Sequence, residues 1–272
     1  MNFLYGFLDY SEGKHRLHQD DTISVEYLMN SDGYRSDEFS KETSREVVLS
    51  VGCSFTFGAG LPFKNTWPLV LQGMLGLTAN ANIAIPGLSP NIMINNVYTY
   101  VREYGKPRAV TILLPNLQRY YNITQTDKTV HVKPQLFHHL SPNRRSSVIQ
   151  TKQDLDFVNK LMTKENLAYD LVHRLIQLEE YLFAIGVPLV YTAWAPEVVN
   201  ILEEQTQLKN FFPISQDERK QYLFDNKDGY SNEEEQLLWD EAADRPNAHP
   251  GISENRFFAE LFYRELKERY DI

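Results

Sequence analysis

A largely apolar run that stops at a glycine constrains the fold of this chain more than any other feature. Residues 47–52 read Val-Val-Leu-Ser-Val-Gly, which predicts a strand buried on both faces. The following segment, residues 53–60, reads Cys-Ser-Phe-Thr-Phe-Gly-Ala-Gly. Ser54 therefore lies just past the carboxyl end of a central strand, where open α/β sheets bind their ligands. Ser54 is a candidate nucleophile; the alternative is a turn serine that bonds only the local backbone.

Strand and helix patterns alternate along the rest of the chain. Helices are expected at residues 66–76, 91–104, 154–185 and 253–270, and further strands at 81–85, 110–114 and 187–193. This alternation predicts right-handed parallel crossovers and a three-layer α/β/α sandwich with a parallel central sheet.

The 272 residues suit one large domain with additions. We expect residues 1–45 to form a polar lead that wraps the surface of an α/β domain spanning 46–272. Two long insertions are expected, near 118–151 and near 200–243. The first shows little periodicity and the second is acidic and polar, so neither predicts clear elements of its own.

The far end of the chain supplies the partners that a nucleophilic serine needs. Residues 244–251 read Asp-Arg-Pro-Asn-Ala-His-Pro-Gly, just before the last expected helix. Ser54, Asp244 and His249 make a set of nucleophile, orienting acid and base. Each has a bland alternative, such as a histidine that caps the last helix. Their joint occurrence favours catalysis.

Four short blocks in this order resemble those of the SGNH (GDSL-type) hydrolase family of serine esterases. The blocks are Gly52-Cys53-Ser54 with Thr56 and Gly58, then Gly87, then Pro115-Asn116-Leu117, and finally His249-Pro250. The chain resembles a divergent variant, because Gly-Cys-Ser replaces the family's Gly-Asp-Ser. It also departs from the family's Asp-x-x-His-Pro, because Pro246 stands three residues before His249 and the nearest acid is Asp244.

The resemblance implies a flavodoxin-like fold and a role for each matched residue. Ser54 would be the nucleophile and His249 its base, with Asp244, or otherwise a backbone carbonyl, orienting the imidazole. The oxyanion hole would consist of the amides of Ser54 and Gly87 and the side chain of Asn116. No cofactor is implied. Trp194, at the exit of the expected strand 187–193, either lines the substrate pocket or packs in the core.

Three hypotheses of function follow from the resemblance. The first is an esterase that removes small acyl groups, such as O-acetyl groups on carbohydrate. The second is a non-catalytic structural or carbohydrate-binding protein that keeps the fold as part of a larger assembly such as a phage particle. The third, weaker hypothesis is a transferase that passes the same acyl group to an alcohol.

Composition argues against other partners. The formal net charge of -9 with scattered basic residues argues against nucleic acid, which requires a basic face. The mean hydropathy of -0.43 gives no sign of a membrane span. No secretory signal is recognised in residues 1–9, so a cytoplasmic or virion-associated protein is expected.

The remaining reactive residue types are interpreted as structural. Cys53 is the single cysteine, so no internal disulfide is possible, and a packed thiol is favoured over a catalytic one. His131 and the adjacent pair His138 and His139 lack helical ligand spacing and acidic or cysteine partners nearby. Surface histidines are therefore favoured over a metal site.

Overall fold

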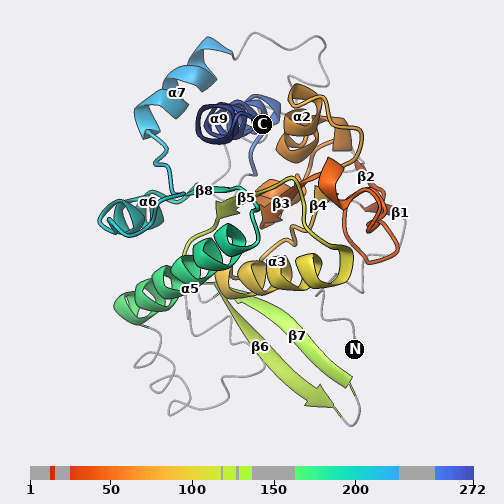
Figure 1. Ribbon diagram of the computed structural model, residues 1–272, viewed down its shortest axis with the longest axis horizontal. Coiled ribbons are helices and arrows are strands. Elements are labelled where there is room, and N and C mark those ends of the chain that lie inside the picture. The colour runs from red at the N-terminus through yellow and green to blue at the C-terminus, as the bar shows by residue number, and fades with distance from the viewer. Residues whose placement is uncertain (1–12, 16–24, 118, 127–128, 137–162, 227–248) are drawn as a thin grey trace.

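The computed structural model describes residues 13–15, 25–117, 119–126, 129–136, 163–226 and 249–272 (Figure 1). The strands are β1 (Gly13–His15), β2 (Val25–Tyr27), β3 (Val48–Gly52), β4 (Ala81–Asn82), β5 (Ala109–Leu114), β6 (Arg119–Thr126), β7 (Thr129–Leu136) and β8 (Leu189–Ala193). The α-helices are α1 (Ser54–Phe57), α2 (Trp67–Met74), α3 (Pro90–Tyr104), α5 (Lys164–Ala184), α6 (Pro196–Glu203), α7 (Gln216–Asp225) and α9 (Ile252–Tyr270). Two 3₁₀ turns, η1 (Ser44–Glu46) and η2 (Phe63–Asn65), complete the elements described.

The central sheet is parallel and its strands lie in the order β4-β3-β5-β8. In the register of the three strands β3, β5 and β8, Leu49 pairs with Val110 and Val110 pairs with Leu189. When the four strands are numbered in chain order, their order in the sheet is 2-1-3-4, the arrangement of doubly wound, flavodoxin-like sheets. The expected parallel three-layer fold is thus confirmed.

Helices cover both faces of the sheet (Figure 1). Helices α2 and α9 pack together on one face, while α3 and α5 lie on the other. Alternation along β5 serves both layers: Ile112 faces the cluster formed with α3 and α5, and Leu113 faces the cluster formed with α2 and α9. This is why the central strands are apolar on both faces.

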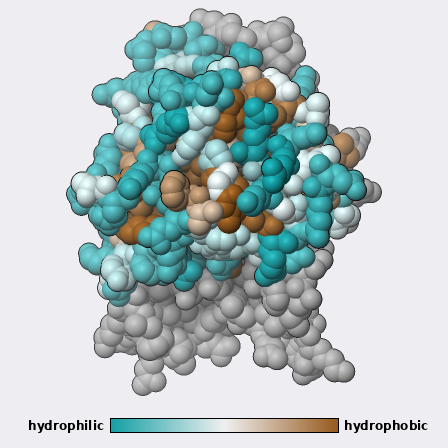
Figure 2. Space-filling model, viewed as in Figure 1, coloured by the Kyte–Doolittle hydropathy of each residue, from teal (hydrophilic) through white to brown (hydrophobic). Residues whose placement is uncertain are grey.

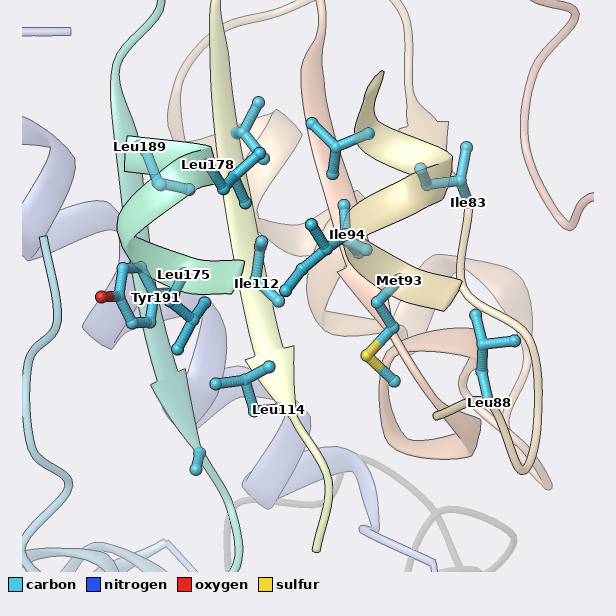
Figure 3. Close-up of a cluster of buried hydrophobic side chains, with 14 of the residues drawn as sticks. Ile83, Leu88, Met93, Ile94, Ile112, Leu114, Leu175, Leu178, Leu189 and Tyr191 are labelled. Carbon is cyan, nitrogen blue, oxygen red and sulfur yellow. The ribbon is translucent and has the colours of Figure 1, made fainter. Parts of the chain in front are cut away.

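The larger core lies between the sheet and helices α3 and α5. In Figure 3, Met93 and Ile94 of α3 and Leu175 and Leu178 of α5 approach the strand residues, among them Ile112. On the face shown in Figure 2, apolar residues appear only as patches among hydrophilic ones. Of the helices in the described ranges, none is both long and apolar enough to cross a membrane.

A buried carboxylate holds the outer strand of the sheet. Glu179 of α5 is 8% exposed and accepts hydrogen bonds from the Tyr191 hydroxyl at 2.8 Å and from the backbone N–H groups of Lys209 and Asn210 at 3.1 and 2.9 Å. Burial, together with the charge of Glu179, raises the pKa of Tyr191. Glu179 therefore has the hydrogen-bond partners that a buried polar group requires.

The region around 118–151 differs from expectation, because it contains a hairpin. Strands β6 and β7 pair antiparallel from Arg119 with Leu136 to Thr126 with Thr129, and Figure 1 shows them extending away from the three layers. The two strands have only a short apolar alternation among proline and histidine residues, so their period-2 signal is weak.

Other expected segments are only partly described. Helix α5 begins at Lys164, where the N-cap Thr163 accepts from the N–H of Asn166 at 3.2 Å; residues 154–162 lie outside the described residues. Between residues 200 and 226, α7 and the buried Phe212 and Ile214 are found. Thr66 occupies the N-cap position of α2, but its hydroxyl donates to the Phe63 carbonyl at 2.9 Å.

A buried arginine in the lead segment joins that segment to the domain. Arg35 is 0% exposed, and its guanidinium donates to the carbonyls of Phe57, Gly58 and Leu61 at 3.1, 2.7 and 2.6 Å. The guanidinium carbon also lies 4.4 Å from the ring centroid of Tyr27, a cation–π distance. Burial lowers the pKa of Arg35 to about 10, which leaves it charged at neutral pH.

Replacing Arg35 should destabilise the whole domain. Arg35→Met leaves three buried carbonyls without their donor, so we expect the free energy of unfolding to fall by about 2–4 kcal/mol. Urea unfolding followed by circular dichroism measures this change. Arg102→Met is the matched control, because the Arg102 side chain is 59% exposed and pairs with Glu103 at the surface. Equal midpoints for the two variants would contradict the role given to Arg35.

Candidate active site

Four of the predicted site residues follow strands that end at the same edge of the sheet. Gly87 follows β4, Ser54 follows β3, Asn116 follows β5 and Trp194 follows β8. Because the strands are parallel, their carboxyl ends meet at one edge, and neighbouring strands lie about 5 Å apart. The order of the strands therefore places Ser54 between Gly87 on one side and Asn116 on the other.

This edge also contains the topological switch point of the sheet. The chain runs from β3 outward to β4, then crosses back to β5 on the other side of β3 and continues to β8. Ligands of doubly wound sheets bind in the crevice where the direction reverses, which here lies between β3 and β5. Ser54 and Asn116 are the polar residues that follow these two strands.

Ser54 begins a single helical turn. The N–H of Phe57 donates to the carbonyl of Cys53 at 2.8 Å, and the N–H groups of Gly58 and Ala59 donate to the carbonyl of Ser54 at 3.1 and 3.0 Å. As the first helical residue, Ser54 has an N–H with no acceptor inside α1. Its side chain is nearly buried, at 6% exposure, and its Oγ lies 4.0 Å from the Sγ of Cys53, which is itself fully buried.

The turn after β3 is tight because the chain doubles back on the strand end. A Cβ on Gly52 would lie 1.9 Å from Oγ1 of Thr56, so only glycine fits there. The side-chain Nδ2 of Asn82 donates to the Thr56 carbonyl at 3.0 Å, and its Oδ1 accepts from the N–H of Ala84 at 3.0 Å. Asn82 thereby ties α1 to the exit of β4.

Gly87 occupies a position that favours glycine. The N–H of Leu88 donates to the Ile85 carbonyl at 3.1 Å, and Gly87 has φ +79°. With Pro86 before it, this is a type II turn, which requires positive φ at its third residue. The turn bond uses the N–H of Leu88, so it does not occupy the amide of Gly87. Asn116 is 7% exposed on the opposite side of Ser54.

Three rings gather beside the serine. Phe55 stacks on Trp194 with centroids 4.4 Å apart and an interplanar angle of 23°. The same Phe55 ring meets His249 edge-on at 6.0 Å. His249 is exposed, whereas Trp194 is half-buried and packs against both hydrophobic clusters. The chain thus brings His249 next to Phe55, the residue that follows Ser54, across 194 positions of sequence.

Two groups of sequence predictions fall outside the described residues. Asp244 lies within 227–248, so its role as orienting acid stays a prediction. The side chains of His131, His138 and His139 likewise fall outside those described. Within the described ranges, no group of three or more His, Cys, Asp or Glu side chains is arranged to hold a metal ion.

Sequence reasoning missed some of the residues that shape this site. Tyr27 accepts a hydrogen bond from the N–H of Gly60 at 2.9 Å, and Arg35 holds the carbonyls of the same loop. Phe55 was also missed as a contact of both Trp194 and His249. The available signal for Phe55 was its place directly after the candidate nucleophile. The hydrogen bond that the Tyr27 hydroxyl accepts from the Gly60 N–H leaves no pattern in the sequence.

Comparison with known proteins finds matches among solved structures. No family model matches the chain, and no curated protein matches it. Ten chains among solved structures match. One, described as the crystal structure of TesA, is 14% identical, with 82% of this chain and 98% of that chain covered and a TM-score of 0.46. A likeness of this strength assigns no activity and no residue role to the present chain.

The loop after Ser54 offers a test that separates backbone strain from steric clash. Gly58 and Gly60 have φ of +74° and +86°, but a Cβ at Gly58 would lie 2.2 Å from Cγ2 of Thr66, whereas one at Gly60 would meet nothing within 4 Å. Gly60→Ala should cost about 1–2 kcal/mol from strain alone. Gly58→Ala should cost about 1–3 kcal/mol more from overpacking. Chemical denaturation measures both, and equal losses would rule out the Thr66 contact as a constraint.

Proposed function

We propose that this chain is a serine hydrolase of the SGNH type that cleaves small acyl esters. The observation that carries the proposal is the order of residues along one sheet edge, with Ser54 at the switch point between Gly87 and Asn116. A nucleophile flanked by two donors is the arrangement that acyl transfer requires. The ring contact between Phe55 and His249 supports His249 as the base, because it brings the imidazole next to the residue that follows Ser54.

In the proposed reaction, His249 accepts and returns one proton in each of two half-reactions. The Ser54 hydroxyl attacks the ester carbonyl while the His249 imidazole accepts its proton, because a neutral hydroxyl is a poor nucleophile. The imidazolium then protonates the leaving alcohol, and an acyl group remains on Ser54. Water then attacks the acyl-enzyme while His249 accepts its proton, and this proton passes to the Ser54 oxygen as the carboxylic acid leaves. Asp244, or a backbone carbonyl, would fix the tautomer of His249.

The negative charge of the tetrahedral intermediate needs donors that are already in place. The amide N–H of Ser54 at the start of α1, the amide of Gly87 in its turn, and the Asn116 side chain would donate to this oxygen. Such donors lower the barrier most when they are held by the surrounding fold. The hydrogen bonds of Arg35 and Asn82 restrain the backbone segments that carry two of these donors, the amides of Ser54 and Gly87.

The aromatic pair supports a small organic substrate. Phe55 and Trp194 give the site an apolar wall, as small-molecule sites usually have. An acyl group of O-acetylated carbohydrate fits this reading, with the sugar ring against the half-buried indole of Trp194.

Removing the proposed nucleophile or base should abolish ester hydrolysis. We expect Ser54→Ala and His249→Ala each to lower kcat for a short-chain chromogenic ester by about 10⁴-fold or more, because these groups act as a unit. Asp244→Asn should lower kcat by a comparable factor if Asp244 orients the imidazole, and should leave it unchanged if a backbone carbonyl does so. A fluorophosphonate probe should label the wild type at Ser54.

Two results would overturn the esterase proposal. One is a wild type that neither hydrolyses the ester nor takes up the probe; this outcome would favour a binding or structural protein that keeps the fold. The other is activity that survives Ser54→Ala.

Asn116 is open to a separate test. Asn116→Ala should raise the barrier by about 2.7–4 kcal/mol, seen as a lower kcat with KM little changed, because the donor acts mainly in the transition state. Asn91→Ala is the control, since Asn91 on α3 donates to Asp170 at 2.7 Å instead. A loss confined to KM would show that Asn116 binds substrate and does not stabilise the oxyanion.

A further inference from the structure

A second asparagine, Asn255, connects the turn after His249 with the start of α2. It is on α9, four residues after the N-cap Gly251, and is 0% exposed. Its Nδ2 donates to the carbonyls of Pro250 and Gly251 at 3.1 and 3.0 Å, and its Oδ1 accepts from the N–H of Trp67 at 3.0 Å. One buried side chain thus makes three hydrogen bonds to backbone from two distant segments.

The first of these segments carries His249. Pro250 and Gly251 follow His249 directly, so the two Nδ2 bonds fix the backbone from which the imidazole projects. His249 itself is exposed, and Phe55 is its described ring contact. Fixing this backbone limits where the imidazole of His249 can reach.

The second segment leads back to Ser54. Trp67 is the first residue of α2, and its N–H has no acceptor inside that helix. The N-cap Thr66 makes no side-chain cap bond, so Asn255 supplies an acceptor from another helix. Thr66 in turn packs against Gly58, whose carbonyl is held by Arg35. The α2 start is therefore in contact with the loop that follows the nucleophile.

We propose that Asn255 is a positioning residue that sets His249 against Ser54. The inference rests on the proposed function for its consequence in catalysis, although the anchor itself is a structural statement. By joining the turn after His249 to the start of α2, Asn255 fixes the base relative to the serine loop. Small misplacements of a base cost far more in rate than in binding, because proton transfer needs close approach.

Two substitutions separate the parts of this anchor. Asn255→Asp keeps the acceptor for the Trp67 N–H but loses the two hydrogen bonds donated to the carbonyls of Pro250 and Gly251. Asn255→Ala loses all three hydrogen bonds. If the donors position His249, both variants should lose kcat by about 10²-fold. KM should change little, and the rate of fluorophosphonate labelling at Ser54 should fall in parallel with kcat.

Glu179→Gln is the matched control. Glu179 also makes three hydrogen bonds in the interior, two of them to backbone, but to Tyr191 and the segment 209–210. The substitution is isosteric, as Asn255→Asp is, and should leave kcat and the labelling rate unchanged. A fall in kcat in this control equal to that in Asn255→Asp would mean that general destabilisation explains the loss, and would overturn the positioning role.

A structural readout keeps the inference testable apart from activity. In protein with labelled Phe and His rings, the wild type should show a nuclear Overhauser contact between Phe55 and His249, and both Asn255 variants should lose it while their melting remains cooperative. The wild-type amide of Trp67 should exchange slowly with solvent. Fast exchange there would overturn the anchor even if neither variant folded.

The outcomes distinguish failure of the inference from failure of the proposed function. An active wild type whose Asn255 variants keep both kcat and the ring contact would contradict the positioning role alone. A wild type without activity or labelling would contradict the esterase proposal, while loss of the ring contact in the Asn255 variants would still show that Asn255 places His249.

Discussion

The buried guanidinium of Arg35 is the interaction on which the site region depends. A charge removed from water needs strong partners, and the polar partners that the described residues provide for it are backbone carbonyls of the loop after Ser54. Three fixed carbonyls hold the course of residues 57–61, and Tyr27 holds the amide of Gly60 within the same loop. The lead segment therefore acts as part of the domain, because without it the loop after Ser54 loses its main polar contacts.

The candidate site is built by combining residues from the ends of several strands. Parallel strands supply Gly87, Ser54 and Asn116 in a fixed lateral order, and no loop needs to be long for this to happen. His249 is different, because it comes from near the C-terminus and reaches the edge through the packing of α9 against α2. The sheet sets the spacing of Gly87, Ser54 and Asn116, whereas helix packing sets the place of His249.

The sequence predicts most of the framework and only part of the site. Continuous apolar runs identify β3, β5 and β8, and helical periodicity identifies α3 and α9, because burial on both faces or on one stripe leaves a direct pattern. The bonds of Arg35 could not be predicted, because its partners are main-chain oxygens that carry no sequence signature. Asn255 bonds to Trp67 across 188 positions, and only the packed fold makes them neighbours. The hairpin β6–β7 gives too short an alternation to stand out.

Phe55 and Trp194 pack against both hydrophobic clusters, one on each face of the sheet. At the carboxyl edge of the sheet, the helical layers on its two faces therefore share the same side chains. A ligand bound on this aromatic pair, as proposed, would stabilise the native state by mass action through groups common to both layers. Neither layer could then open alone while the ligand stayed bound, so occupancy of the site would make unfolding of the domain more nearly a single event.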